Sequence, residues 1–450
     1  MKKVRIGSGA GYAGDRVDPA VELLKKGDLD YIIFECLAER TIGLARQEML
    51  ADPTKGYSRQ LEYRLSQVLG PAKEHGVKII SNMGAVNPHA AVAKAIEIAK
   101  QQGITGLKFA AVTGDSVFEN IEQYYEKDIL EFPGKIRDYR DRLVSANAYV
   151  GAEGIMEALR NGADVIITGR VSDPTLTVAP LCYEFGWTLE DNPDQLGQAV
   201  LAGHLLECGG QVTGGYYADP GYKEVQGLDH LGFPLVEFSS DGSFILTKVE
   251  GSGGLVSVDT CKEQMLYEIH NPAAYLTPDA TADFSQVRFT QVGKDRVSAV
   301  GATSHGRPEQ LKVNLCYKDS FICEGEVSYG GSNALARAQM AAEMILKRID
   351  LLDIETNEVR VDYIGYDSLY GSKIADCIGT GMAPEIRLRV AVRTQDRANA
   401  MKMYNDFDSV YTNGPSGGGG ATMKVSEIIS VFSCFVDRAD VTQNVEYEVI

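Results

Sequence analysis

The chain has 450 residues, of which 44% are hydrophobic and 24% are charged, and its formal net charge is −18. This composition is typical of a soluble globular protein and excludes disordered and fibrous classes. The negative charge disfavours nucleic acid and anionic membrane surfaces as partners. The eight cysteines form no C-x-x-C pair, so we expect a reduced, cytoplasmic protein without a zinc ribbon or a disulfide framework.

Short apolar runs alternate with helical patterns in the first half of the chain. A clear helical pattern covers Pro88–Gln102, with an apolar stripe of Ala91, Ala95, Ile96 and Ala99. Runs rich in Ile and Val without alternation are typical of strands buried on both faces of a parallel sheet. We therefore predict a doubly wound, largely parallel α/β domain over residues 1–215. Its expected strands are Val4–Ile6, Tyr31–Phe34, Lys78–Ile80, Leu107–Val112 and Val165–Thr168.

The second half has a different pattern. Asp241-Gly242 between two apolar runs predicts a β-hairpin. We predict an α+β domain over residues 216–450 with an antiparallel or mixed sheet, contributing a glycine-rich loop to the cleft of the first domain. Further expected strands are Val287–Gln291, Arg296–Val300, Leu311–Tyr317, Phe321–Val327 and Ile386–Arg393, and expected helices are Ala334–Arg348 and Arg397–Tyr404.

Small or polar residues follow all five strands predicted in the first domain. Ligands of an open parallel sheet bind beyond the carboxyl ends of its strands, so the sequence predicts an active-site cleft at this edge. The candidate residues are Ser8, Gly9, Gly11, Gly14, Asp15, Arg16, Glu35, Asn82, Asn87, Asp115, Gly169, Arg170 and Asp173.

The Gly9-x-Gly11-x-x-Gly14 turn formally matches the dinucleotide-binding fingerprint, with Glu35 near the place of the ribose-binding acid. The helix after such a turn should begin within the glycines, but Asp15 to Asp18 intervene here. The turn fits the binding of a carboxylate or phosphate, with Arg16 as counter-charge, better than that of a dinucleotide. A plain tight turn that requires glycine is the alternative.

Three residues at the strand ends are candidates for direct chemistry. A guanidinium at Arg170 can bind a carboxylate through two hydrogen bonds. Glu35 and Asp115 are candidate acids or bases, because burial at a sheet edge can raise a carboxyl pKa. The alternative is that Arg170 forms a salt bridge with Asp173 or Asp115 and that the carboxylates serve capping or pairing.

His204 and Glu207 share one face of a predicted helix that begins near Asp194. We interpret them as further site candidates, together with the glycines Gly214 and Gly215 that follow. Two such side chains do not complete a metal site, and a histidine interacting with the helix dipole is the alternative. Gly418 and Gly419 in the loop Asn413–Gly420 are candidates for a lid or an anion-binding nest.

The sequence resembles the acyclic terpene utilisation AtuA-like family in long, irregular strings. It departs from the family at Asn82–Pro88, where relatives more often have Asn-Ala-Gly-Gly before Asn-Pro. The strings that carry the resemblance are Gly7–Arg16, Asp30–Glu35, Leu37–Thr41, Gly151-Ala152, Gly162–Asp173, Ala202–Cys208, Gln211–Gly215, Gly251–Gly254 and Tyr275–Asp279.

The resemblance implies a cytoplasmic protein of branched-acid catabolism, where acids are often handled as coenzyme A thioesters. Some relatives carry a small C-terminal ferredoxin-like domain, for which this chain has no obvious equivalent before Ile450. We therefore expect a separate small ferredoxin-like subunit, in a homo- or hetero-oligomer.

Our leading hypothesis is a lyase, hydratase or isomerase that abstracts a proton from a small hydroxy- or unsaturated carboxylate or its CoA thioester. In this hypothesis Arg170 and Arg16 orient the carboxylate, Glu35 or Asp115 moves the proton, and Asn82 stabilises negative charge. No organic cofactor is required, and a divalent metal is an alternative that the sequence does not favour. Two other hypotheses are an NAD(P)-dependent oxidoreductase and a non-catalytic scaffold for a small partner.

Overall fold

The computed structural model describes residues 2–378 and 383–450, and the chain divides into two units. Unit 1 comprises Met1–Cys316 with Val431–Ile450, and unit 2 comprises Tyr317–Ser430. This division differs from the predicted boundary at residue 215, because the strand Pro234–Ser239, which follows this residue, pairs with the first strand of the chain. Among the described residues, no helix is long and apolar enough to cross a membrane.

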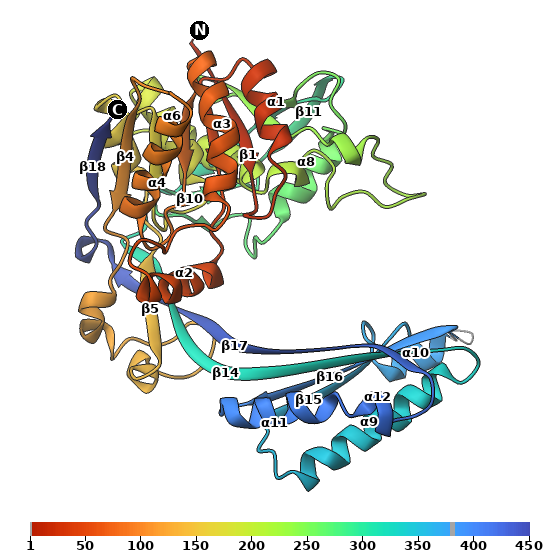
Figure 1. Ribbon diagram of the computed structural model, residues 1–450. Coiled ribbons are helices and arrows are strands. Elements are labelled where there is room, and N and C mark those ends of the chain that lie inside the picture. Colours follow the sequence, from red (N-terminus) through yellow and green to blue (C-terminus); the bar gives the residue numbers. More distant parts are fainter. Residues whose placement is uncertain (1, 379–382) are drawn as a thin grey trace. The chain divides into compact units, whose positions relative to one another are not determined.

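A ten-stranded sheet forms the centre of unit 1 (Figure 1), with the strand order β11-β12-β8-β7-β1-β2-β3-β6-β4-β18. Its five central strands are parallel and correspond to the five strands predicted in the first domain. Their Ile and Val side chains are buried on both faces, which confirms the doubly wound architecture. These strands are β1 (Lys3–Ala10), β2 (Tyr31–Phe34), β3 (Lys78–Ser81), β6 (Val165–Thr168) and β4 (Lys108–Thr113).

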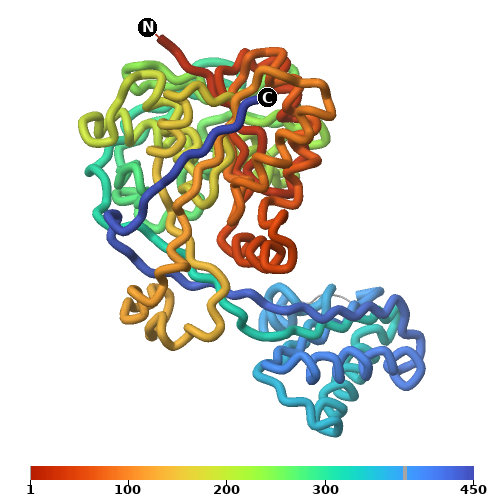
Figure 2. The backbone as a smooth tube through the Cα atoms, turned by 60° about the vertical axis from the view of Figure 1, so that its left-hand side comes forward, coloured from red at the N-terminus to blue at the C-terminus, as the bar shows by residue number. Residues whose placement is uncertain are grey.

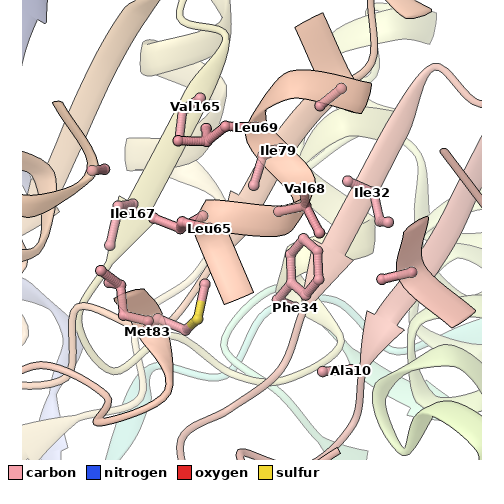
Figure 3. Close-up of a cluster of buried hydrophobic side chains, with 14 of the residues drawn as sticks. Ala10, Ile32, Phe34, Leu65, Val68, Leu69, Ile79, Met83, Val165 and Ile167 are labelled. Carbon is pink, nitrogen blue, oxygen red and sulfur yellow. The ribbon is translucent and has the colours of Figure 1, made fainter. Parts of the chain in front are cut away.

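Helices cover both faces of this sheet. One group consists of α1 (Asp18–Lys26), α3 (Leu61–His75) and α4 (Pro88–Gln101), and the other consists of α5 (Glu153–Arg160), α6 (Thr175–Phe185) and α7 (Pro193–Glu207). In the core beneath the first group, Leu65 and Val68 of α3 pack with Ile32, Phe34 and Ile79 of the sheet (Figure 3). Helix α2 (Glu39–Ala51) follows β2 directly.

Antiparallel strands extend the parallel core at both edges. The predicted hairpin at Asp241-Gly242 is confirmed, because β7 and β8 pair there and β7 also pairs with β1. At the other edge, the C-terminal β18 runs beside β4 (Figure 2). The added strands are β7 (Pro234–Ser239), β8 (Phe244–Lys248), β11 (Arg288–Gly293), β12 (Arg296–Val300) and β18 (Asn444–Val449).

The remaining elements of unit 1 lie outside this sheet. Helix α8 spans Val258–Leu266, and a small sheet contains β9 (Tyr275–Leu276), β10 (Thr281–Asp283) and β13 (Thr303–Ser304). Strand β5 (Leu143–Ala148), which the sequence analysis did not predict, pairs with β14.

Apart from two short helices at Ser372–Ile378 and Val410–Asn413, unit 2 has the order β-α-β-β-α-β. Its sheet has the strand order β15-β16-β14-β17, which is the ferredoxin-like topology. The predicted strands Leu311–Tyr317 and Phe321–Val327 are one continuous strand. Gly418 and Gly419, predicted in a loop, are the first residues of β17. The elements are β14 (Gln310–Gly330), α9 (Ala334–Leu351), β15 (Glu358–Ile364), α10 (Ser372–Ile378), β16 (Glu385–Thr394), α11 (Arg397–Phe407), α12 (Val410–Asn413) and β17 (Gly418–Asp437).

The ferredoxin-like topology thus occurs in unit 2 of this chain. Apolar side chains of α9 and α11, including Ile345 and Phe407, pack on the apolar residues of β16, such as Leu388 and Val390. Strands β14 and β17 each run from one unit into the other. Because both boundaries lie inside continuous strands, neither is marked by a linker in the sequence.

Candidate active site

A cavity of about 1220 Å³ opens in unit 1 beyond the carboxyl ends of the parallel strands. Residues distant in the sequence form its wall: the segment after β2, the turn after β6, the end of α7, and parts of β9, β14 and β17. Six residues predicted for the site line this cavity, namely Gly11, Glu35, Arg170, Asp173, His204 and Glu207. Four of them, Gly11, Glu35, Arg170 and Asp173, were predicted because they follow strands, and His204 and Glu207 were predicted from their spacing on a helix; other residues that follow strands lie elsewhere.

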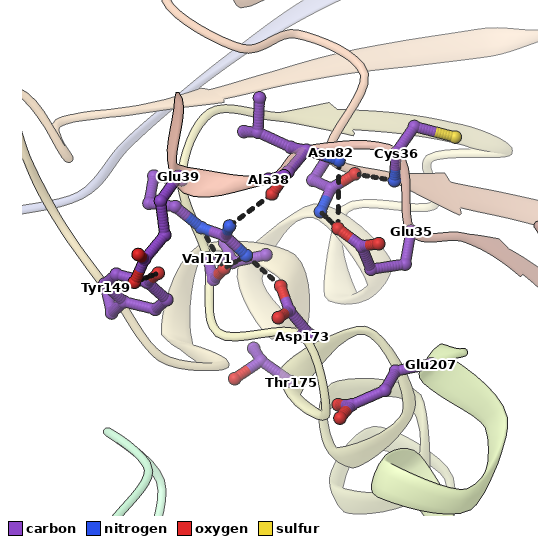
Figure 4. Close-up of polar contacts among 12 residues, drawn as sticks. Glu35, Cys36, Ala38, Glu39, Asn82, Tyr149, Val171, Asp173, Thr175 and Glu207 are labelled. Carbon is purple, nitrogen blue, oxygen red and sulfur yellow. Dashed lines mark hydrogen bonds and ion pairs between the residues drawn. The ribbon is translucent and has the colours of Figure 1, made fainter. Parts of the chain in front are cut away.

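Glu35 follows the last residue of β2, and two hydrogen bonds fix its carboxyl group. Its Oε1 atom accepts from the Nδ2 atom of Asn82 at 3.0 Å and from the backbone N–H of Leu37 at 2.9 Å. Burial raises the pKa of Glu35 to about 8, and the nearby Asp173 adds to this rise. Figure 4 shows the carboxyl groups of Glu35, Asp173 and Glu207 around one space. Glu35 can therefore hold or release a proton near neutral pH.

Arg170 lies at the cavity wall, but its side chain is only 1% exposed and binds the protein itself. Its Nε atom donates to the carbonyl of Val171 at 2.7 Å, and its Nη1 atom donates to the carbonyl of Leu37 at 2.5 Å. The Nη2 atom donates to Val171 and to Asp173. Few N–H groups remain for a ligand, so the geometry supports the predicted alternative, a salt bridge with Asp173, over a two-point carboxylate clamp.

His204 and Glu207 form a buried pair at the end of α7. The Nδ1 atom of His204 lies 2.7 Å from the Oε1 atom of Glu207. The remaining polar atoms, Nε2 of His204 and Oε2 of Glu207, are buried without a hydrogen-bond partner. Six other buried side-chain atoms of the described residues also have no partner, so it is the position of both residues in the cavity wall that makes this pair a site candidate. This pair is therefore a stronger site candidate than its sequence pattern indicated.

The charges of this pair depend on each other. Burial raises the pKa of Glu207 to about 7, although His204 opposes the rise. Burial alone would lower the pKa of His204, but the Glu207 carboxylate outweighs it and leaves that pKa raised. The pair can thus exchange a proton near neutral pH and titrates as a unit.

Three predicted residues, Asn82, Asp115 and Gly169, lie outside the cavity wall and contact the residues that form it. Asn82 binds Glu35, and its Oδ1 atom accepts from the backbone N–H of Cys36 at 2.8 Å. Asp115 is buried, and its Oδ2 atom accepts from the backbone N–H of Arg170 at 3.0 Å. A Cβ atom at Gly169 would lie 2.3 Å from Asp115. These residues hold the loops that carry Glu35 and Arg170, and they are not part of the cavity wall.

The protein itself fills the glycine turn after β1. A Cβ atom at Gly11 would lie 2.1 Å from the backbone carbon of Cys208. The buried Arg64 donates to the carbonyls of Gly9, Ala13 and Asp15. The close approach that glycine permits is therefore used by backbone, in the place where a dinucleotide-binding turn would receive a pyrophosphate.

The other predicted residues of this turn have structural partners. Asp15 accepts from the backbone N–H of Gly11 at 2.8 Å, and Arg16 donates to the carbonyls of Leu228 and Asp229. Ser8 is fully buried in β1, and a Cβ atom at Gly14 would meet the ring of Tyr12. None of these four residues lines the cavity.

The remaining predicted residues also lie elsewhere. Asn87 caps α4 through the backbone N–H of Ala90 and binds the carbonyls of Pro53 and Lys55. The backbone N–H groups of Gly214 and Gly215 donate to the carbonyls of Gln211 and Gly210. Gly418 and Gly419 belong to unit 2 and form no part of this unit 1 cavity.

The sequence analysis missed several residues of the cavity wall. Lys312 donates to the Oε1 atom of Glu39 at 2.8 Å, and the hydroxyl of Tyr149 donates to the same atom at 2.9 Å. The ring of Tyr275 lies 5.3 Å from that of His204. These residues come from loops and from β9 and β14, so no strand-end pattern reveals them. Arg40 also lines the cavity. It closely follows the predicted strand Tyr31–Phe34, so the strand-end pattern could have selected it.

A protein holds a metal ion through several side chains that converge on one point. Within residues 2–378 and 383–450, no three His, Cys, Asp or Glu side chains converge to hold a metal ion.

Comparisons with known proteins give one strong match. The family model described as "Acyclic terpene utilisation family protein AtuA" matches residues 4–447. No curated protein matches the chain.

Two solved structures are similar only in small part. The de novo designed protein Foldit4 is 10% identical over 24% of this chain and 99% of its own, with a TM-score of 0.18. A protein described as an aminohydrolase, from methicillin resistant Staphylococcus aureus, is 12% identical over 25% of this chain and 31% of its own, with a TM-score of 0.14. These scores carry no argument about fold or function. The family match, in contrast, runs from β1 to β18, and the chain belongs to the acyclic terpene utilisation AtuA family.

Proposed function

We propose that the chain is an enzyme, a hydro-lyase or an isomerase, that moves a proton on a small hydroxy- or unsaturated carboxylate or its CoA thioester. This proposal places the protein in branched-acid catabolism and requires no organic cofactor. The observation that carries it is the pairing of two proton-exchanging groups in one cavity. Glu35 has a pKa of about 8 and Glu207, bound to His204, has a pKa of about 7.

Acid–base catalysis requires groups whose pKa values lie near the working pH, because they must both donate and accept protons during turnover. In a dehydration, one group accepts the proton of the carbon next to the carboxyl carbon. The other group protonates the departing hydroxyl, which leaves as water while the carbon–carbon double bond forms. An isomerisation needs only a proton taken at one carbon and returned at another.

Glu35 and the Nε2 atom of His204 are the groups that we assign to these two transfers. Arg40 is the cation that we assign to the substrate carboxylate, because it lines the cavity and forms none of the ion pairs found among the described residues. Arg170 then acts as a positioning residue, since it ties the segment after β2 to the turn after β6.

The test is deuterium exchange and hydration measured by NMR. The full chain is incubated in D₂O with crotonate, crotonyl-CoA and the corresponding β-hydroxy compounds. We expect deuterium at the carbon next to the carboxyl carbon, or interconversion of the two compounds, and a loss of at least about a hundredfold in Glu35→Gln. Glu97→Gln, on the exposed surface of α4, is the matched control. Equal exchange in Glu35→Gln and in the wild-type chain would refute the assignment.

The other two hypotheses have less support. The packed glycine turn disfavours a nicotinamide-dependent oxidoreductase, because Gly11 touches the backbone of Cys208. A scaffold role does not account for a cavity whose wall holds Glu35 and Glu207 with raised pKa values. A separate small subunit stays a prediction, tested by co-purification of the chain with its neighbours in the cell.

A further inference from the structure

The charges on the cavity wall are strongly unequal. Seven carboxylates line the cavity, against three Lys or Arg side chains. Two of these cations are already paired, because Arg170 binds Asp173 and Lys312 binds Glu39. Glu268, Glu309 and Asp437 have no Lys or Arg partner among the ion pairs of the described residues. The wall therefore keeps a net negative charge even with Glu35 and Glu207 protonated.

A wall of this charge repels a polyanion. Each phosphate group of coenzyme A carries between one and two negative charges, and the whole chain adds a net charge of −18. Repulsion of this kind costs binding free energy at short range and lowers the rate of encounter. A CoA thioester would need several cations at the rim of the cavity, and among the described residues that line it only Arg40 is available without breaking an ion pair.

One carboxylate, in contrast, fits the polar part of the wall. Arg40 is exposed in the first turn of α2 and lines the cavity together with Ala38, Glu39 and Thr41. No side chain caps this helix end, so its partial positive charge adds to that of Arg40. The Glu39 carboxylate, which would compete for this place, is bound by Lys312 and Tyr149.

The rest of the wall is suited to an apolar chain. Leu37, Tyr149, Tyr267, Leu276, Leu311 and Phe435 line the cavity. Its volume of about 1220 Å³ exceeds the range of about 300–1000 Å³ that is usual for small-molecule sites. A short hydrophilic acid would leave most of this surface in contact with water.

We propose that the cavity takes its substrate as a free monocarboxylic acid with an apolar chain, and not as a coenzyme A thioester, and that Arg40 binds the carboxylate. The claim that the bound acid is a substrate rests on the proposed function. The preference for the free acid does not, because binding can be measured without turnover. The proposal narrows the two substrate forms left open above to one.

The experiment compares three probes with the same acyl chain: hexanoate, hexanoyl-CoA and hexanamide. They are saturated, so the proposed reaction does not consume them. Their dissociation constants for the full chain are measured by calorimetry. We expect hexanoate to bind at least about tenfold more tightly than hexanoyl-CoA at low salt, and added salt to reduce this difference because it screens the repulsion.

The variant Arg40→Gln should weaken hexanoate binding by about tenfold or more, because it removes a charge-assisted hydrogen bond, and should leave hexanamide binding unchanged. Arg140→Gln, at an exposed arginine outside the cavity, is the matched control and should change neither. Tighter binding of hexanoyl-CoA, no binding of hexanoate, or an unchanged hexanoate affinity in Arg40→Gln would each overturn the proposal.

The two proposals fail in different ways. Hexanoate binding that depends on Arg40, in a chain without exchange activity, would refute the proposed function and support the binding proposal. Turnover of a CoA thioester that depends on Glu35 but not on Arg40 would support the function and refute the binding proposal.

Discussion

The Nδ1 atom of His204 and the Oε1 atom of Glu207 lie 2.7 Å apart inside unit 1, while the outer polar atom of each side chain has no partner. A buried polar atom without a partner costs about 1–3 kcal/mol. Two such atoms, Nε2 of His204 and Oε2 of Glu207, belong to neighbouring side chains in the cavity wall. We interpret this cost as that of keeping two groups ready for a ligand.

The first prediction concerns this pair. Glu207→Gln keeps an oxygen that can accept from Nδ1 of His204, but it removes the proton exchange of the pair. We expect activity to fall by about 10²–10⁴-fold, with little change in melting temperature. Asp194→Asn, in the exposed first turn of the same helix, is the control. A normal turnover rate in Glu207→Gln would show that the pair serves structure alone.

The second prediction concerns the pH dependence of stability at Glu35. Its pKa rises from 4.5 to about 8 on folding, so the folded chain holds this proton where the unfolded chain has released it. Stability therefore falls as pH rises through this window, by up to about 1.4 kcal/mol per pH unit. The side chain of Gln does not titrate, so Glu35→Gln does not lose this stability as pH rises. We therefore expect the melting temperature of Glu35→Gln, relative to that of the wild type, to increase from pH 5.5 to 8.

The control for this measurement is Glu97→Gln. The pKa of Glu97 is lowered by its hydrogen bond with Lys94, so its window lies below pH 4.5. The difference in melting temperature between Glu97→Gln and the wild type should stay constant between pH 5.5 and 8. If the difference in melting temperature between Glu35→Gln and the wild type also stayed constant, this would contradict a raised pKa of Glu35.

Patterns of local sequence were sufficient to predict the central sheet and part of the site. Runs such as Tyr31–Phe34 need no partner information to be identified as buried strands. A residue directly after such a strand, such as Glu35 or Arg170, is carried to one edge of the sheet by the parallel topology. The i, i+3 spacing likewise places His204 and Glu207 together on one helix face.

Other features depend on partners that local sequence does not specify. The side chain of Arg170 follows a strand as predicted, but its direction is set by the carbonyls of Leu37 and Val171. Tyr275 and Lys312 reach the cavity through tertiary structure only. The Asp241-Gly242 turn predicts a hairpin, but not that its first strand, β7, pairs with β1 instead of starting a new domain.

The third prediction follows from the packing of Arg170. Arg170→Ala removes a buried guanidinium and leaves the carbonyl of Leu37 and the carboxylate of Asp173 without their partner. The Asp173 side chain is 34% exposed, so solvent partly screens the carboxylate that is left behind. Leaving these groups without their partner costs about 1–3 kcal/mol, and we expect a fall in the melting temperature of the chain. If stability were unchanged and only KM rose, Arg170 would bind substrate as the sequence first indicated.

The fourth prediction compares two glycines. Gly11→Ala places a Cβ atom 2.1 Å from the backbone of Cys208, whereas Gly70→Ala in α3 meets nothing within 4 Å. We expect Gly11→Ala to lower the melting temperature and to reduce activity, because it displaces the end of α7. Gly70→Ala should stabilise the chain by about 0.5–1 kcal/mol, since glycine is costly inside a helix. Equal effects of the two changes in thermal melts would contradict the packing of the glycine turn.

The fifth prediction concerns unit 2. The segment Tyr317–Ser430 contains its own apolar core, in which α9 and α11 pack on β16, and the chain enters and leaves it on the neighbouring strands β14 and β17. We therefore expect the excised segment to fold alone and to unfold cooperatively in circular dichroism melts. Phe407 fills the space above Gly325 in this core, so Phe407→Ala should destabilise the segment by about 3–5 kcal/mol. The exposed Met340 of α9 provides the control, because Met340→Ala removes no core contact. A gradual melt that Phe407→Ala does not alter would mean that this segment requires unit 1 in order to fold.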